Sequence, residues 1–161
     1  MNRRSFLLSS TLTLTLAGAA ALPSLSHGQP KAPDRVVKTP EEWKKVLTPE
    51  QFTILREEGT ERPYSSALNN EKRKGTFVCA GCDLPLFTSD TKFESGTGWP
   101  SFYAAIPGAV GTKVDYKLIA PRTEYHCRRC DGHQGHVFPD GPKPTGQRYC
   151  NNGVALKFVP A

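Results

Sequence analysis

The sequence lacks the features that mark several large classes of protein. No internal repeat and no second domain stand out in its 161 residues, which fit one domain. The formal charge is +6, of which Arg3 and Arg4 supply two, so the chain after its first stretch carries +4. Because this charge is scattered, apart from residues 72–74 and 128–129, we expect no nucleic-acid-binding surface. The Gly-x-Gly turn at residues 96–98 is not followed by a helix signature, so it does not indicate a phosphate-binding loop.

No long apolar surface helix stands out in the sequence, and we therefore expect a monomer.

Residues 1–26 have the layout of a twin-arginine export signal. Arg3 and Arg4 precede an apolar, threonine-interrupted run that reaches Leu22. This run is short and weakly hydrophobic for a membrane span, and an uncleaved leader that anchors the protein is the alternative. We therefore expect a periplasmic protein without stable membrane association after cleavage. Residues 27–38, which contain proline and glycine and little apolar content, are predicted to be a flexible linker.

Two capping boxes predict two short helices at the start of the folded domain. Residues 39–42 and 48–51 each place a threonine at the N-cap, proline at the first helical position and Glu or Gln two residues after the proline. The first helix would present an apolar face made of Trp43, Val46 and Leu47. The second would end before Gly59 and present Phe52, Ile54 and Leu55.

The remainder of the chain is expected to be mostly β. Residues 62–75 are polar and turn-rich, and beyond the strand that begins at Gly75 the segments are short, β-branched or aromatic, and interrupted by glycine and proline. The predicted strands are Gly75–Val78, Thr112–Ile119, Thr123–Cys127, His136–Phe138 and Gly153–Val159. Together with the two helices they form one domain, residues 39–161.

Four of the five cysteines form two Cys-x-x-Cys pairs, the usual pattern of a metal knuckle. A two-residue spacer lets both sulfurs turn toward one ion, and four thiolates at tetrahedral corners suit a structural Zn²⁺. Two redox-active dithiols or an iron–sulfur centre are the competing interpretations. A closed site of four thiolates has no open coordination position, so the metal would not be the catalyst. The predicted ligands are Cys79, Cys82, Cys127 and Cys130.

Cys150 is left over once the four knuckle cysteines are assigned, and it calls for an explanation. If residues 148–158 form a strand, alternation places Arg148, Cys150 and Asn152 on one face. A guanidinium beside a thiol favours the nucleophilic thiolate, which makes Cys150 a candidate reactive residue. The alternative is an ordinary buried cysteine in an apolar strand.

Two further segments hold candidate site residues whose role the local sequence leaves open. His133 and His136 follow the second knuckle, where general acid chemistry, metal ligation or simple turn polarity would each explain them. Trp99 lies in a glycine-rich turn between the two knuckles, where a core position is the default interpretation.

Taken together, these motifs resemble the B-type methionine-R-sulfoxide reductases. The resemblance covers roughly residues 38–159, and its order of motifs is specific. It rests on the two knuckles and on the segments Gly98-Trp99-Pro100-Ser101-Phe102, His133-x-Gly135-His136-Val137-Phe138 and Arg148-Tyr149-Cys150-x-Asn152. It implies two small antiparallel sheets and a structural zinc ion away from the active site.

The resemblance also implies roles for individual residues. Cys150 would be the nucleophile, and His133 or His136 would protonate the sulfoxide oxygen. Asn152 would orient a histidine or that oxygen, and Trp99 would offer an apolar face to the substrate methyl group. Phe138 and Arg148 would complete the substrate site.

One position departs from the family pattern. Many members carry a second, resolving cysteine in the loop before the tryptophan, where this chain has Thr97. We therefore expect a sulfenic acid on Cys150 that an external thiol, either a thioredoxin-like protein or a small thiol, reduces directly. A zinc-ribbon-like binding module and a periplasmic thiol peroxidase are the competing functions.

Overall fold

The computed structural model describes residues 33–161, so the predicted export signal and the first half of the predicted linker, residues 27–32, lie outside the described residues. Within the described part, residues 33–39 run without regular structure against the second knuckle, where Val36 N–H donates to the Arg129 carbonyl (2.8 Å). No helix in residues 33–161 has the length and apolar content needed to cross a membrane.

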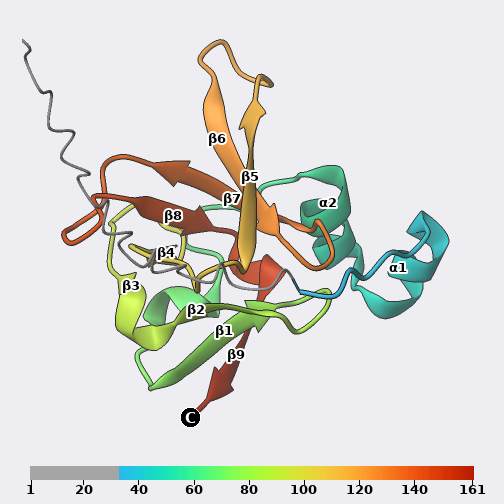
Figure 1. The fold of residues 1–161 in the computed structure, drawn as a ribbon, viewed down its shortest axis with the longest axis horizontal. Coiled ribbons are helices and arrows are strands. Elements are labelled where there is room, and N and C mark those ends of the chain that lie inside the picture. Colours follow the sequence, from blue (N-terminus) through green and yellow to red (C-terminus); the bar gives the residue numbers. More distant parts are fainter. Residues whose placement is uncertain (1–32) are drawn as a thin grey trace, which may run out of the picture.

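Both predicted helices are present, with the predicted caps. Helix α1 (Pro40–Val46) and helix α2 (Pro49–Glu57) each begin with a complete capping box, at Thr39 and Thr48. Trp43 and Leu47 are buried as expected, but Val46 is 60% exposed, so its assignment to the apolar face is wrong. Val46 is the last residue of α1 and lies at the edge of the apolar stripe, where the chain leaves the helix. Helix α2 packs against the larger sheet (Figure 1).

Two antiparallel sheets form the body of the domain, as predicted (Figure 1). The three-stranded sheet has the order β2-β1-β9, and the six-stranded sheet has the order β3-β4-β8-β7-β6-β5. Their strands are β1 (Gly75–Cys79), β2 (Pro85–Thr88), β3 (Lys92–Phe93), β4 (Ser101–Phe102), β5 (Val110–Asp115), β6 (Arg122–Cys127), β7 (His133–Phe138), β8 (Arg148–Asn151) and β9 (Leu156–Pro160). Short 3₁₀ turns follow the helices and strands at η1 (Ala67–Asn70), η2 (Ser89–Thr91) and η3 (Gly153–Ala155).

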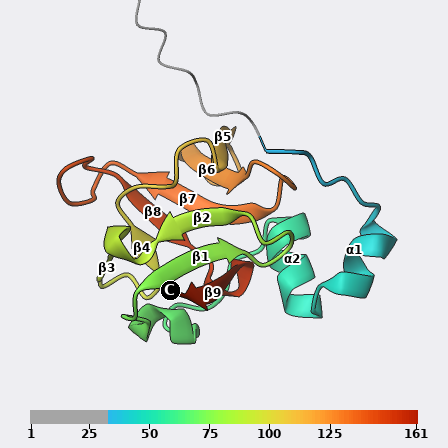
Figure 2. The ribbon, with the colours of Figure 1, turned by 60° about the horizontal axis from the view of Figure 1, so that its bottom comes forward.

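An aromatic cluster fills the space between the two sheets. Phe87 stacks on Phe102 at 4.2 Å between ring centroids, and Phe77 meets Phe102 edge-on at 4.9 Å. All three rings are fully buried, and each such burial is worth about 1.5–3 kcal/mol. The cluster fixes β4 against β1 and β2, and β4 in turn pairs with β8, the strand that carries Cys150 (Figure 2).

The assumption of one continuous strand over residues 148–158 is wrong. Strand β8 stops at Asn151, η3 follows, and β9 belongs to the other sheet. The strand breaks because the buried Glu61 carboxylate accepts hydrogen bonds from the Gly153 and Val154 N–H groups, which would otherwise pair with a neighbouring strand. Gly153 also lies so close to Ser66 that a Cβ would sit 1.9 Å from its hydroxyl oxygen.

The predicted strand 112–119 also ends earlier than expected, at Asp115. The Asp115 carboxylate accepts the Lys117 N–H (2.8 Å) and pairs with Arg122 (2.6 Å), which turns the chain out of the sheet. Strands β2, β3 and β4 were not among the predicted strands, and β8 was included only as the first part of the assumed strand over residues 148–158. They have two to four residues each, too few to produce a readable alternation.

Candidate active site

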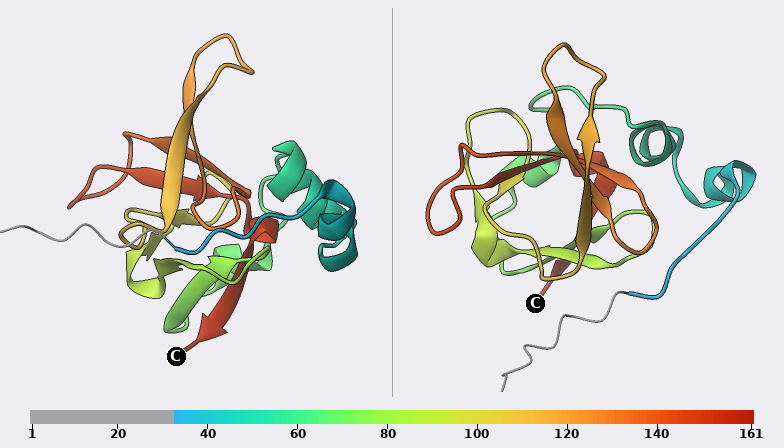
Figure 3. Two further views of the ribbon diagram at one scale, coloured as in Figure 1. Left: turned by 45° about the vertical axis from the view of Figure 1, so that its right-hand side comes forward. Right: turned by 45° about the horizontal axis from the view of Figure 1, so that its top comes forward.

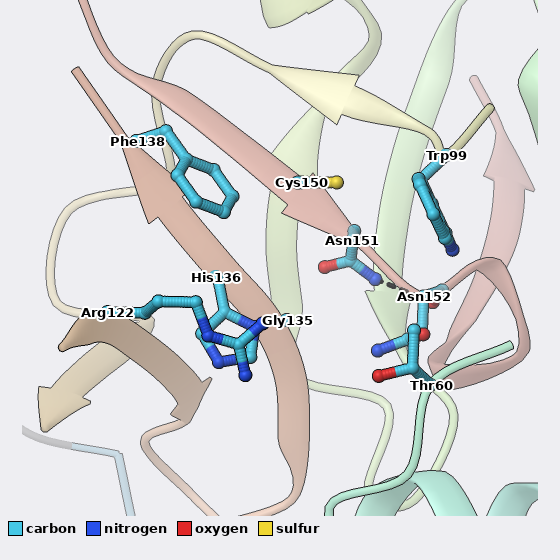
Figure 4. Close-up of a pocket in the computed structure, with 9 residues that line it drawn as sticks. All are labelled: Thr60, Trp99, Arg122, Gly135, His136, Phe138, Cys150, Asn151 and Asn152. Atoms are coloured by element: carbon cyan, nitrogen blue, oxygen red, sulfur yellow. Dashed lines mark hydrogen bonds between the residues drawn. The ribbon is translucent and has the colours of Figure 1, made fainter. Parts of the chain in front are cut away.

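A pocket of about 130 Å³ opens over strands β7 and β8 (Figure 4). It contains five of the seven predicted active-site residues: Trp99, His136, Phe138, Cys150 and Asn152. It is also lined by four residues that the sequence did not single out: Thr60, Arg122, Gly135 and Asn151. Residues from five separate parts of the chain therefore meet around one thiol.

Cys150 lies on β8 between two neighbouring strands, opposite Ser101 of β4 and His136 of β7. Strands β7 and β8 approach closely here, since a Cβ on Gly135 would lie 1.9 Å from the Cys150 carbonyl oxygen. The Cys150 side chain is half-buried, and it takes part in no disulfide. The strand pairing thus holds the thiol at the pocket floor next to a histidine.

The electrostatic setting of Cys150 differs from the expected one. Burial raises the pKa of the Cys150 thiol above its ordinary value, and the opposing effects of Arg148 and Thr97 do not outweigh burial. The Arg148 guanidinium also pairs twice with Asp140 (2.9 and 2.8 Å) and lies 4.6 Å from the centre of the Phe138 ring, so its charge is shared between Asp140 and the thiol. The surroundings of Cys150 therefore favour its protonated thiol form.

The two histidines occupy different environments. His136 lines the pocket, and its Nε2 lies 2.7 Å from Asp115 Oδ2, a contact that fixes the ring. The amide of Lys117, and after it His136, lowers the pKa of Asp115, so this carboxylate stays charged. His133 is only 2% exposed and does not line the pocket.

His133 is paired with a buried acid rather than with the pocket. Its Nδ1 lies 3.1 Å from Glu124 Oε1, yet neither ring nitrogen makes an aligned hydrogen bond to any described residue. Burial lowers the pKa of His133 more than Glu124 raises it, which favours a neutral ring. The rings of His133 and His136 lie 5.5 Å apart in an edge-on arrangement, so His133 lies behind His136 as seen from the pocket.

Glu61 organises the side of the pocket that carries Trp99 and Asn152. Its backbone N–H donates to Asn152 Oδ1 (3.0 Å), and its carbonyl accepts from Trp99 Nε1 (3.2 Å). Its carboxylate accepts from Gly153 N (2.6 Å) and Val154 N (2.9 Å). Burial raises the pKa of Glu61, partly offset by these two amides. Sequence reasoning missed Glu61, because an isolated Glu in a turn-rich segment looks solvated.

We expect Glu61→Ala to lower the free energy of unfolding by about 2–4 kcal/mol, because two buried amides lose their acceptor. Glu61→Gln keeps one acceptor oxygen and should cost less. Urea denaturation of both variants measures the difference. If Glu61→Ala costs less than about 1 kcal/mol, the carboxylate does not hold η3 in place.

Thr97 lies beside Cys150 at the head of a chain of hydroxyl groups. Its side chain acts to lower the pKa of the Cys150 thiol and lies 2.8 Å from Ser95 Oγ, which in turn lies 2.8 Å from Ser101 Oγ. Ser101 is fully buried and is the strand partner of Cys150. The position that lacks a resolving cysteine is therefore within reach of the thiol and filled by a polar group.

The four remaining cysteines form one cluster at the other end of β7. Their sulfur atoms all lie within 4.8 Å of one another, as ligands of a single metal ion would. The two knuckles have the same turn, in which Asp83 and Asp131 adopt left-handed backbone conformations and donate N–H bonds to the first cysteine's carbonyl. Cys79 and Cys82 pair across with Cys130 and Cys127 at 3.7 and 3.5 Å.

The surroundings of this cluster fit a group of metal-bound thiolates. Gln134 Nε2 lies 3.4 Å from Cys79 Sγ, and Arg56 Nη2 lies 3.6 Å from Cys130 Sγ. Donors aimed at sulfur, one of them cationic, offset the negative charge that four thiolates leave on a divalent ion. None of the four cysteines lines the pocket of Cys150, which agrees with a structural rather than a catalytic ion.

Comparison with known proteins gives a consistent family. The SelR domain matches residues 47–160. A peptide methionine sulfoxide reductase MsrB of Methanosarcina barkeri is 58% identical over 124 residues, which cover 76% of this chain and 87% of that protein. Proteins of the same name from Pseudomonas putida and Leptospira interrogans are 54% and 55% identical. They cover 78% and 76% of this chain, and 96% and 95% of their own lengths.

Proposed function

This chain belongs to the SelR-domain family, the B-type methionine-R-sulfoxide reductases, and we propose that it works through a sulfenic acid on Cys150 that an external thiol reduces. The observation that carries the proposal is the pocket in which Cys150, His136 and Trp99 meet. The closing test is an assay with separated R and S epimers and dithiothreitol as reductant. Equal turnover of both epimers would contradict it.

In the proposed reaction the Trp99 ring and Phe138 hold the substrate's methyl sulfoxide group over the thiol. A sulfoxide sulfur is a poor electrophile until its oxygen is protonated or strongly hydrogen-bonded. His136 lines the pocket and is oriented by Asp115, so we assign it the proton transfer to that oxygen. His133 and Glu124 support the position of its ring. The Asn152 side-chain amide accepts from the Glu61 N–H and donates to the Gln134 carbonyl, so it shapes the pocket wall.

The atoms of the first step balance without a further reactant. The Cys150 sulfur attacks the sulfoxide sulfur and loses its proton, and the oxygen passes to Cys150 as methionine leaves. One sulfoxide and one thiol thereby become one thioether and one sulfenic acid. Because burial raises the pKa of Cys150, substrate must favour ionisation of the thiol as it binds, and the nearby Arg148 guanidinium stabilises the developing thiolate.

The second step needs a thiol from outside the chain. All five cysteines are described, four of them cluster together, and Thr97 stands where a resolving cysteine would be. The external thiol attacks the sulfenic sulfur and releases water, and a second thiol resolves the mixed disulfide. A thioredoxin-like protein or a small thiol fits this role.

We expect one turnover without reductant to leave Cys150 heavier by about 16 Da, the mass of one oxygen. Mass spectrometry of the intact protein and of the Cys150 peptide measures this. Thr97→Cys is the matched variant, since its thiol would replace the hydroxyl beside Cys150 and trap a disulfide instead. An intramolecular disulfide at Cys150 in the unmodified protein would contradict the proposed recycling.

Three further assignments complete the proposal. The metal is Zn²⁺, because a closed set of four thiolates with no open position suits it best, and elemental analysis should find about one ion per chain. Residues 1–26 direct the protein to the periplasm through the twin-arginine route, which would allow the metal to be loaded in the cytoplasm before export.

The mature protein acts as a monomer, and its substrate is methionine-R-sulfoxide, either free or within a protein.

A further inference from the structure

The turn between β5 and β6 carries an unusual concentration of exposed apolar side chains. Val114, Tyr116, Leu118 and Ile119 are 54%, 75%, 58% and 107% exposed, and we call residues 114–119 the apolar tip. Elsewhere in the described chain only four other large apolar side chains are exposed, and they are scattered. Figures 1 and 3 show this hairpin projecting beyond the rest of the fold. A cluster of exposed apolar side chains of this kind indicates a surface that binds a partner molecule.

The apolar tip is directly joined to the wall of the active-site pocket. Asp115 ends β5 within the tip and holds His136 at 2.7 Å. Arg122 begins β6 just after the tip, pairs with Asp115 at 2.6 Å and lines the pocket. A molecule that covers the tip therefore lies at the edge of the pocket that holds Cys150.

The size of the pocket indicates what must lie outside it. Its volume of about 130 Å³ is well below the roughly 300–1,000 Å³ of pockets that enclose whole small ligands. It accepts one side chain, so the rest of a polypeptide substrate has to run over the surface on either side.

A second exposed aromatic lies on the other side of the pocket. Tyr64 is 71% exposed, its hydroxyl donates to the Gly96 carbonyl (2.8 Å), and its ring packs beside Gly98, next to Trp99. In Figure 4, Trp99 and Arg122 stand on opposite sides of Cys150. Apolar surface thus flanks the pocket at both ends, as an extended chain crossing it would require.

The charges near the tip favour an apolar partner over an acidic one. Lys113 and Lys117 both pair with Glu58 at 2.5 Å, so their charges are already matched. These two lysines lower the pKa of Glu58 to about 2, which keeps it ionised throughout the physiological range. An acidic partner would have to displace Glu58, whereas apolar side chains need only cover the tip.

We propose that the apolar tip docks the polypeptide that carries the methionine sulfoxide, in an oxidised protein that is at least locally unfolded. Such a chain exposes the apolar side chains that a folded protein buries. This inference rests on the proposed function, and it adds the surface that receives the polypeptide on either side of the methionine sulfoxide. Free methionine sulfoxide would fill the pocket without touching the tip.

The test compares two substrates with the triple variant Tyr116→Ser, Leu118→Ser and Ile119→Ser, with dithiothreitol as reductant. We expect kcat/KM for an oxidised, unfolded polypeptide to fall by about tenfold, the scale of losing one apolar hot spot. The value for N-acetyl-methionine-R-sulfoxide should stay unchanged. Tyr116→Phe keeps the apolar area and should keep the polypeptide activity. Val46→Ser and Val159→Ser, which alter exposed apolar residues on α1 and β9, are the matched controls.

Each other outcome overturns the proposal in a recognisable way. An equal loss on both substrates would assign the tip a supporting role for His136, and no loss on either would leave it without a docking role. A loss that appears only when a protein donor replaces dithiothreitol would assign the tip to the reductant. Light scattering that finds a dimer disrupted by the triple variant would assign it to a second copy. An unmodified protein inactive on both substrates would refute the proposed function itself.

Discussion

Cys150→Ser is expected to lower kcat/KM for methionine-R-sulfoxide by on the order of a thousandfold or more, because no other described thiol faces the pocket. A serine hydroxyl is a far weaker nucleophile at neutral pH than a thiol, and it forms no sulfenic acid. The same change should leave folding intact, since Cys150 is only half-buried and makes no disulfide. Steady-state assays with the R epimer measure the loss.

The control is Tyr149→Phe, one residue earlier on β8. Adjacent strand residues face opposite sides, and Tyr149 packs into the aromatic core near Phe87 and Tyr125. We expect this variant to keep its activity within about twofold, since it removes only a hydroxyl from the far face of the strand. Substantial residual activity in Cys150→Ser would remove Cys150 from the mechanism, whatever the state of the fold.

The sequence was most informative where the chemistry is local. The capping boxes at Thr39 and Thr48 fixed both helix starts, because a helix N-terminus is determined by four neighbouring residues. The two knuckles predicted the cysteine cluster for the same reason. Five of seven predicted active-site residues came together, through motifs whose members are close in sequence.

The sequence was least informative where a contact joins distant segments. Glu61 reaches Gly153 across 92 positions, and Asp115 reaches His136 across 21, and neither acid stands in a recognisable motif. The sequence also predicted a thiolate at Cys150, but burial raises the pKa of the thiol more than Arg148 lowers it, and Arg148 also pairs with Asp140. The position of Arg148 two residues before Cys150 shows neither the burial of the thiol nor the pairing with Asp140.

The second large effect concerns the cysteine cluster. Cys82→Ser is expected to abolish tight metal binding and to lower the free energy of unfolding by on the order of 5 kcal/mol or more, a large part of a domain's stability. Cys82 is the least buried member of the cluster, so the substitution itself adds little strain. Cys150→Ser is the matched control, because it makes the same chemical change outside the cluster. Metal content and thermal unfolding by circular dichroism distinguish the two variants.

Loss of the metal should also lower the activity, because Gln134 connects the cysteine cluster to the active-site pocket. This fully buried residue donates to Cys79 Sγ at 3.4 Å, and its carbonyl accepts from the backbone and side-chain nitrogens of Asn152 at 2.8 and 3.0 Å. Its side-chain oxygen also accepts from Asn151 at 3.5 Å. Freeing the Cys79 sulfur loosens the residue that anchors one wall of the pocket, so activity should decline along with stability.

Hydrogen exchange distinguishes this local link from global unfolding. In Cys82→Ser under native conditions, the Asn152 amide should lose protection at lower free energy than the amides of residues 75–77, which lie in the other sheet at the end of β1 away from Cys79. Uniform loss across both sheets would mean that the cluster supports the fold as a whole and not the pocket in particular. A Cys82→Ser protein with unchanged melting temperature would mean that the four sulfurs hold no stabilising ion at all.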